Sequence, residues 1–133
     1  MNQKLAKEWL KAALDDIKTI EKILEDKDLT HIVAFHSEQA IEKSLKAILI
    51  FNNKELPKIH SLIRLFGICE SYIKIDLKEY QELIIKLDEL YLDSRYPADF
   101  GLLPYGKPSE KDAISFYEFA RKIFEYVSEK IRK

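Results

Sequence analysis

The sequence predicts an all-α protein, an up-and-down bundle of about five helices that forms a single domain over residues 1–133. Apolar residues recur at spacings of three and four through most of the chain, as they do on the buried face of a helix. No stretch of useful length alternates apolar and polar residues in the way that a strand does. The 3 glycines and 4 prolines are too few for a fold built on many tight β turns.

Two helices are predicted before Pro57. The first is indicated by apolar residues at helical spacing, which are Leu5, Trp9, Ala13, Ile17, Ile20 and Leu24. The stretch "EDKDLT" interrupts this pattern, and Thr30 at its end is predicted to be the N-cap of the second helix. This second helix is expected to end near "FNNKELP", where two asparagines and then Pro57 follow the last apolar residues.

A third and a fourth helix are predicted after Pro57. His60 or Ser61 is expected to cap the third helix, whose apolar residues are Leu62, Leu65, Phe66 and Cys69. The stretch "DLKE", residues 76–79, has the form of a capping box with Asp in place of Ser or Thr. The fourth helix is predicted to follow it, through Tyr80, Leu83, Ile84, Leu87, Leu90 and Tyr91.

The stretch "SRYPADFGLLPYGKPS", residues 94–109, is predicted to be the one long irregular segment. It holds three of the 4 prolines and two of the 3 glycines. Long loops in compact domains often carry function. Ser109 with Asp112 is expected to start the last helix, whose apolar residues run from Ala113 to Val127.

The composition of the chain excludes several classes of protein. No apolar run approaches the roughly 20 residues of a membrane-spanning helix, and the N-terminus has no signal-peptide pattern. A single cysteine, Cys69, rules out an internal disulfide, so a reduced, cytoplasmic protein without a membrane partner is expected. A net charge of -1 and a pI near 6.3 disfavour general coating of nucleic acid, although a local basic patch is compatible with them.

The common metal and nucleophile motifs are missing from the sequence, and no metal site is predicted. His31 and His36 are five residues apart, about 140° around a helix, so they cannot bind one metal from the same face. There is no HExxH, no CxxC and no glycine-rich phosphate loop. Cys69 is predicted to be a buried apolar residue, and Glu38 and Glu42 are interpreted as ordinary charge patterning on a helix surface.

The stretch "FHSEQAIEKSLKAIL", residues 35–49, carries a polar row of His36, Gln39, Lys43 and Lys46 along the second predicted helix. His60 lies at a helix start, where backbone N–H groups attract anions. In "DSRYP", Arg95 supplies a fork for phosphate and Tyr96 supplies a stacking surface. Together these residues are candidates for a basic, aromatic pocket that would suit a nucleotide or an RNA end.

The residue types alone also allow plainer interpretations. Lys43 and Lys46 can be solvated helix charges, and His36 can be an ordinary partly buried histidine. Arg95 can pair with Asp93 or Asp99 and only fix the loop. Trp9 and Tyr91 are interpreted as core or interface packing. A binding site and a structural role therefore both stay open on these grounds.

Three fragments in order give the chain a resemblance to the HEPN domain family. The first is the helix "FHSEQAIEKSLKAIL", the second is "IHSL" shortly after it, and the third is "SRYP" near the end of the fourth predicted helix. The positions that match the family pattern are Gln39, Ala40, Glu42, Lys43, Leu45, Lys46, Ala47, His60, Leu62, Ser94, Arg95, Tyr96 and Pro97. The match spans most of the 133 residues.

The resemblance implies a helical bundle that forms a homodimer in a bacterium or archaeon. It further implies a minimal nucleotidyltransferase as partner, in a two-gene system like a toxin–antitoxin pair. Nucleotide binding, with a purine nucleotide as the ligand, is the function expected from it. The site residues expected to take part are His36, Gln39, Lys43, Lys46, His60, Arg95 and Tyr96.

One branch of the HEPN family consists of metal-independent ribonucleases, and this sequence departs from their motif. That branch carries an Arg followed after four to six residues by a His, whereas Arg95 here is followed by "YPADFGLL". RNA cleavage by that mechanism is therefore disfavoured, and the chain is not expected to be an enzyme on its own. The alternatives are a ribonuclease with another set, such as His36 with Arg95, or a purely structural dimeric interaction protein.

Overall fold

The computed structural model describes residues 2–95 and 107–132, with side chains up to residue 90 in the first of these ranges. In these ranges the chain has no strand and forms five α-helices: α1 (Gln3–Ile23), α2 (Thr30–Phe51), α3 (Leu62–Ile68), α4 (Gln81–Arg95) and α5 (Glu110–Arg132). Two short 3-10 helices, η1 (Lys27–Leu29) and η2 (Lys78–Tyr80), precede α2 and α4. The predicted all-α bundle is confirmed.

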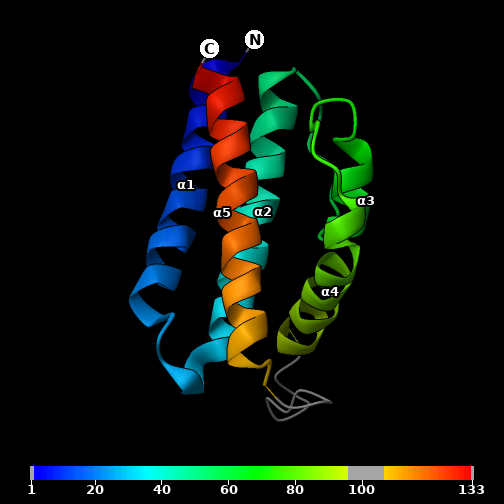
Figure 1. Ribbon diagram of the computed structural model, residues 1–133. Helices are drawn as coiled ribbons and strands as arrows, with labels where there is room; N and C mark the ends of the chain where they lie inside the picture. Colours follow the sequence, from blue (N-terminus) through cyan, green and yellow to red (C-terminus); the bar gives the residue numbers. More distant parts are fainter. Residues whose placement is uncertain (1, 96–106, 133) are drawn as a thin grey trace.

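The five helices form two unequal layers. The long helices α1, α2 and α5 lie side by side, and α1 runs antiparallel to α2 (Figure 1). The shorter α3 and α4 lie beside α2 on the side away from α1. Helix α2 contacts all four other helices, and α4 runs antiparallel to it (Figure 1).

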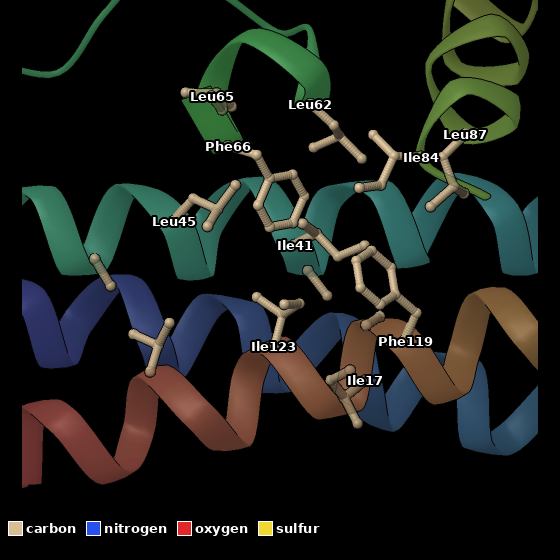
Figure 2. Packing of buried hydrophobic residues seen from close by; sticks show 14 of the residues in the cluster. Ile17, Ile41, Leu45, Leu62, Leu65, Phe66, Ile84, Leu87, Phe119 and Ile123 are labelled. Atoms are coloured by element: carbon tan, nitrogen blue, oxygen red, sulfur yellow. The ribbon is translucent and has the colours of Figure 1, made fainter. Parts of the chain in front are cut away.

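Helix α2 is the centre of the core. Of its 22 residues, 13 are buried, which is far more than one amphipathic face would bury. Ile41 of α2 lies beside Phe66 of α3 and Phe119 of α5 (Figure 2), and the centroids of the two rings are 5.9 Å apart. Within the described ranges, neither α2 nor any other helix is long and apolar enough to cross a membrane.

Small residues bring α1 and α2 close together. Ala6 and Ala13 of α1 and Ala40 and Ala47 of α2 are all fully buried within one chain. The absence of longer side chains at these positions allows the two backbones to approach closely. The close helix contact that Ala40 and Ala47 allow is thus made inside the chain.

Local hydrogen bonds end and begin the helices close to where the sequence predicts. After α2, Asn53 takes a positive φ of 58°, and Lys54 N–H donates to the Leu49 carbonyl at 2.9 Å, which closes the last turn. Ser61 Oγ accepts from Arg64 N–H at 3.4 Å at the start of α3. Ser109 Oγ accepts from Asp112 N–H at 3.0 Å at the start of α5. The predicted boundaries at these three points are confirmed.

The predicted N-cap of α2 is wrong by one residue, and α4 begins a few residues after the predicted capping box. Leu29 is the N-cap of α2, and Thr30 is its first helical residue, with a buried side chain, because η1 leads directly into the helix. Asp76 Oδ1 accepts from Lys78 N–H at 3.1 Å and so starts the 3-10 turn η2, with α4 beginning only at Gln81.

The predicted irregular segment of residues 94–109 falls largely outside the described residues. Its first two residues, Ser94 and Arg95, still belong to α4. Residues 107–109 are not helical and lead into α5.

Candidate functional site

The polar row of α2 lies on the one side of the helix that the bundle leaves partly open. All four residues of the row are partly buried: His36, Gln39, Lys43 and Lys46. The exposed fraction of the side chain is 25% for His36, 28% for Lys43 and 13% for Lys46. Helix α1 flanks them on one side and the α3–α4 layer on the other. The row is therefore neither a fully solvated surface nor part of the apolar core.

Asp16 of α1 fixes two members of this row. Its Oδ1 lies 2.8 Å from His36 Nδ1, and its Oδ2 accepts from Lys43 Nζ at 2.8 Å. Because a carboxylate only accepts, Nδ1 of His36 carries the proton in this pair. Asp16 is 7% exposed, so both bonds form largely out of water.

Glu42 fixes the other end of the row. Its Oε1 accepts from Lys46 Nζ at 2.9 Å and lies 2.8 Å from Nδ1 of His60, which precedes α3. Glu42 is only 4% exposed. The Lys46 ammonium also lies 5.7 Å from the ring centroid of Trp9, which makes a cation–π contact between α2 and α1.

Glu38 is the most deeply buried of the acidic and basic residues in the site, and none of its surface is exposed. Its Oε2 accepts from Gln39 Nε2 at 2.8 Å, and its Oε1 has no hydrogen-bond partner among the described residues. Burial, and then the negative charge of Glu42, raise the pKa of Glu38 to about 9. Glu38 is therefore protonated at neutral pH, and Gln39 links it to Glu42 Oε2 at 3.5 Å.

The interpretation of Glu38 and Glu42 as ordinary charge patterning on a helix surface is correct in one respect, because Glu42 and Lys46 form an i,i+4 ion pair at 2.9 Å, and wrong in placing the two carboxyl groups at the surface. Both carboxyl groups are buried, because α3 and α4 cover the side of α2 on which they lie. With Glu38 protonated, the charges of Lys43 and Lys46 are balanced by Asp16 and Glu42. The centre of the site is thus close to neutral before its histidines are counted.

Asp88 of α4 occupies the start of α3. Its carboxylate accepts from Leu62 N–H at 2.7 Å, from Ile63 N–H at 3.2 Å and from Ser61 Oγ at 3.1 Å. The anion that these N–H groups attract is therefore the protein's own carboxylate. His60, predicted to help an anion bind at this helix start, contacts Glu42.

The remaining two predicted site residues cannot be placed in the same detail. Arg95 is the last residue of α4, and its side chain lies outside the described part of the chain, as do Asp93 and Asp99. Tyr96 lies outside the described residues altogether. The structure thus brings together His36, Gln39, Lys43, Lys46 and His60, and it adds four carboxyl groups, those of Asp16, Glu38, Glu42 and Asp88.

One of these missed carboxylates had a signal in the sequence. Asp16 lies three residues after Ala13 and four before Ile20, on the apolar face of the first helix. A charged residue on such a face needs a buried partner. For Asp88, 26 residues away from Leu62, which it caps, the sequence has no comparable local signal.

Other reactive groups in the described residues do not form a second site. Cys69 is buried, its thiol pKa is raised to about 12 by burial, and its Sγ lies 3.7 Å from the Leu45 carbonyl. Within residues 2–90 and 107–132, no three His, Cys, Asp or Glu side chains are arranged to hold a metal ion. An apolar hollow of ≈ 420 Å³ between α3 and α4, lined by residues such as Phe66 and Ile84, includes no member of the polar row.

The buried pairing of Asp16 generates a stability prediction. Replacing Asp16 with Ala removes the acceptor of both His36 and Lys43, so we expect the free energy of unfolding to fall by about 1–3 kcal/mol. The neighbouring Asp15→Ala is the control, because Asp15 is exposed, and we expect a change within about 0.5 kcal/mol. Urea denaturation measures both variants. Equal effects of the two substitutions would contradict a buried, paired Asp16.

Comparison with known proteins agrees with this architecture. The chain is similar to the crystal structure of TT1696 from Thermus thermophilus, with 24% identity, a TM-score of 0.74, and coverage of 98% of this chain and 99% of that one. It is also similar to ST0689, an archaeal HEPN homologue, with 25% identity, a TM-score of 0.70, and coverage of 95% and 97%. No curated protein sequence matches it. The model of the HEPN domain matches residues 6–131, and the chain therefore belongs to the HEPN domain family.

Proposed function

We propose that this protein is a nucleotide-binding HEPN module that acts as a homodimer with a minimal nucleotidyltransferase as its partner. The observation that carries the nucleotide proposal is the row of half-exposed nitrogen donors beside α2, each fixed by a buried carboxylate. These donors are His36, Lys43, Lys46 and His60. Donors that are already ordered lose little conformational entropy when they bind a phosphate.

The charge balance of the row indicates where further positive charge must come from. Asp16 and Glu42 already neutralise Lys43 and Lys46, so these lysines alone give weak attraction for a phosphate. We assign this further positive charge to Arg95, which follows Asp88 by seven residues, about 10 Å along α4. Helix α4, whose last residue is Arg95, ends toward the end of the bundle where α2 begins (Figure 1), which supports assigning Arg95 to the His36 end of the row.

The other roles follow from the chemistry of a purine nucleotide. Tyr96 is proposed to stack on the base, and Gln39, His36 and His60 are proposed to form hydrogen bonds with it or with the ribose. The proposal of a homodimer is supported by Phe35, a large apolar residue that is 37% exposed and lies on the same open side of α2. The partnership with a nucleotidyltransferase is supported by the family to which the chain belongs.

Calorimetric titration with ATP, GTP and AMP, with and without magnesium, tests the nucleotide proposal. We expect saturable binding that Arg95→Ala weakens by about tenfold or more, because a charge-assisted bond to phosphate is lost. Arg64→Ala is the matched control, since Arg64 is an exposed arginine on α3, and it should bind like the unmodified protein. If Arg95→Ala leaves both affinity and melting temperature unchanged, Arg95 is not in the site. No heat with any nucleotide would favour a dimer that binds only its protein partner.

RNA cleavage by His36 is the second candidate, and the Asp16–His36 contact favours it. Asp16 accepts from Nδ1, which leaves Nε2 as the nitrogen that exchanges protons, the arrangement found in histidines that act as general bases. Incubation with labelled RNA in EDTA is the test, with His31→Ala as the control variant. Cleavage that His36→Ala abolishes and His31→Ala retains would support this candidate. Cleavage that persists in His36→Ala would exclude His36, and intact RNA with the unmodified protein would exclude the activity.

A further inference from the structure

The layer formed by α3 and α4 is held to the rest of the molecule mainly through α2. Its contacts with α5 are fewer. They include the rings of Phe66 and Phe119, 5.9 Å apart, and the ion pair of Lys86 with Asp112 at 3.5 Å. Tyr80, in the η2 turn before α4, also stacks on Phe119 at 4.5 Å. Figure 1 shows this layer standing apart from α1. The boundary between α2 and α4 is therefore the main surface on which this layer depends.

Three carboxyl groups meet at this boundary, and only two of them have matching donors. Glu42 of α2 is compensated by Lys46 and His60. Asp88 of α4 accepts two backbone N–H groups and one hydroxyl at the start of α3. Glu38, fully buried between them, has the Gln39 amide on one oxygen and no described partner on the other.

The remaining element that packs on α2 brings no charge to Glu38. The buried side chains of α5 are apolar except for Tyr117, and its hydroxyl donates to Glu21 of α1 at 2.5 Å. The other buried carboxylate beside α2, Asp16, is paired with His36 and Lys43. Glu38 forms no ion pair among the described residues. If it lost its proton, its negative charge would therefore lie uncompensated beside the negative charges of Glu42 and Asp88.

We propose that the proton on Glu38 is a latch that holds the α3–α4 layer on α2, and that its loss favours a state in which this layer has moved away and Glu38 is hydrated. The latch concerns the cohesion of the fold and does not depend on nucleotide binding. Ionisation of Glu38 would shorten the time for which His60, just before the Asp88-capped start of α3, stays in contact with Glu42 of α2.

The pH dependence of the latch follows from the two states. In the closed state the pKa of Glu38 is about 9, whereas a hydrated glutamate ionises near the ordinary value of 4.5. The closed state therefore binds the proton more tightly than the open state between these values. The contribution of Glu38 to the stability of the closed state is therefore greatest below about pH 4.5. Above this pH it falls, by up to about tenfold in the opening equilibrium for each pH unit, and it levels off above about pH 9.

Hydrogen exchange at pH 6, 7 and 8, with the intrinsic exchange rates divided out, tests this proposal. In the unmodified protein we expect the protection of amides in α3 and α4, such as Leu65 and Leu87, to fall by up to about tenfold for each pH unit. Core amides of α1 and α5, such as Ile17 and Ile123, should stay at least about 100-fold better protected, because the opening is local. Glu38→Gln, which keeps the shape but cannot ionise, should remove the pH dependence.

Two further variants make the outcome decisive. Glu89→Gln changes an exposed residue of the same helix as Asp88 and should retain the full pH dependence. Glu42→Gln removes the negative charge that raises the pKa of Glu38, so the protection should level off at a lower pH than in the unmodified protein. This variant tests the proposal if Glu38→Gln does not fold. A pH dependence that survives in Glu38→Gln would overturn the proposal. Equal protection of α3–α4 and of α1 and α5 would also overturn it, because opening would then be global.

Discussion

The rest of the structure depends on the burial of one helix on nearly all of its sides. Helix α2 is contacted by α1, α5, α3 and α4, so polar residues on it must find partners inside the protein. Burying an ionised group without a partner costs far more than the group's net contribution to stability when paired. The Asp16 and Glu42 clusters satisfy this demand for His36, Lys43 and Lys46, and they link α2 to α1 and to the start of α3. Glu38 does not satisfy it fully, because its Oε1 has no partner among the described residues.

The same constraint shapes what the site can bind. Carboxylates that hold Lys43 and Lys46 in place also cancel their charge, so a ligand must either compete with Asp16 and Glu42 or bring in a further cation. A site of this kind is rigid and only weakly attractive to anions. It therefore favours a ligand that is recognised by several directed hydrogen bonds over one that is held by charge alone.

Sequence alone predicts the features of this fold that depend on neighbouring residues. The apolar spacing of α1, α2 and α5 and the hydroxyl caps at Ser61 and Ser109 are local, and each prediction is confirmed. The prediction of Thr30 as the N-cap of α2 is wrong by one residue, because the 3-10 turn η1 runs directly into the helix and leaves Leu29 without a capping side chain. Fold class therefore follows from periodicity without any knowledge of which helices meet.

The site could be predicted only in part, because its chemistry depends on which side of α2 is covered. The polar row from His36 to Lys46 was visible as a helical stripe, but the burial of Glu38 requires α3 and α4 to pack over it. Asp88 reaches the start of α3 from a helix much later in the chain, which is long-range information that spacing does not contain. The burial of Asp16 does have a signal in the sequence, because a carboxylate on the apolar face of a helix needs a buried partner.

The central claim is that folding around α2 forces Glu38 to keep its proton at neutral pH. The most direct measurement is an NMR titration of the Glu38 side-chain carboxyl carbon, with the resonance assigned through its loss in Glu38→Gln. The account predicts a midpoint near pH 9, set by burial and by the charge of Glu42. A midpoint near 4.5, the value for a hydrated glutamate, would show that Glu38 is ionised in the folded protein and would contradict the account.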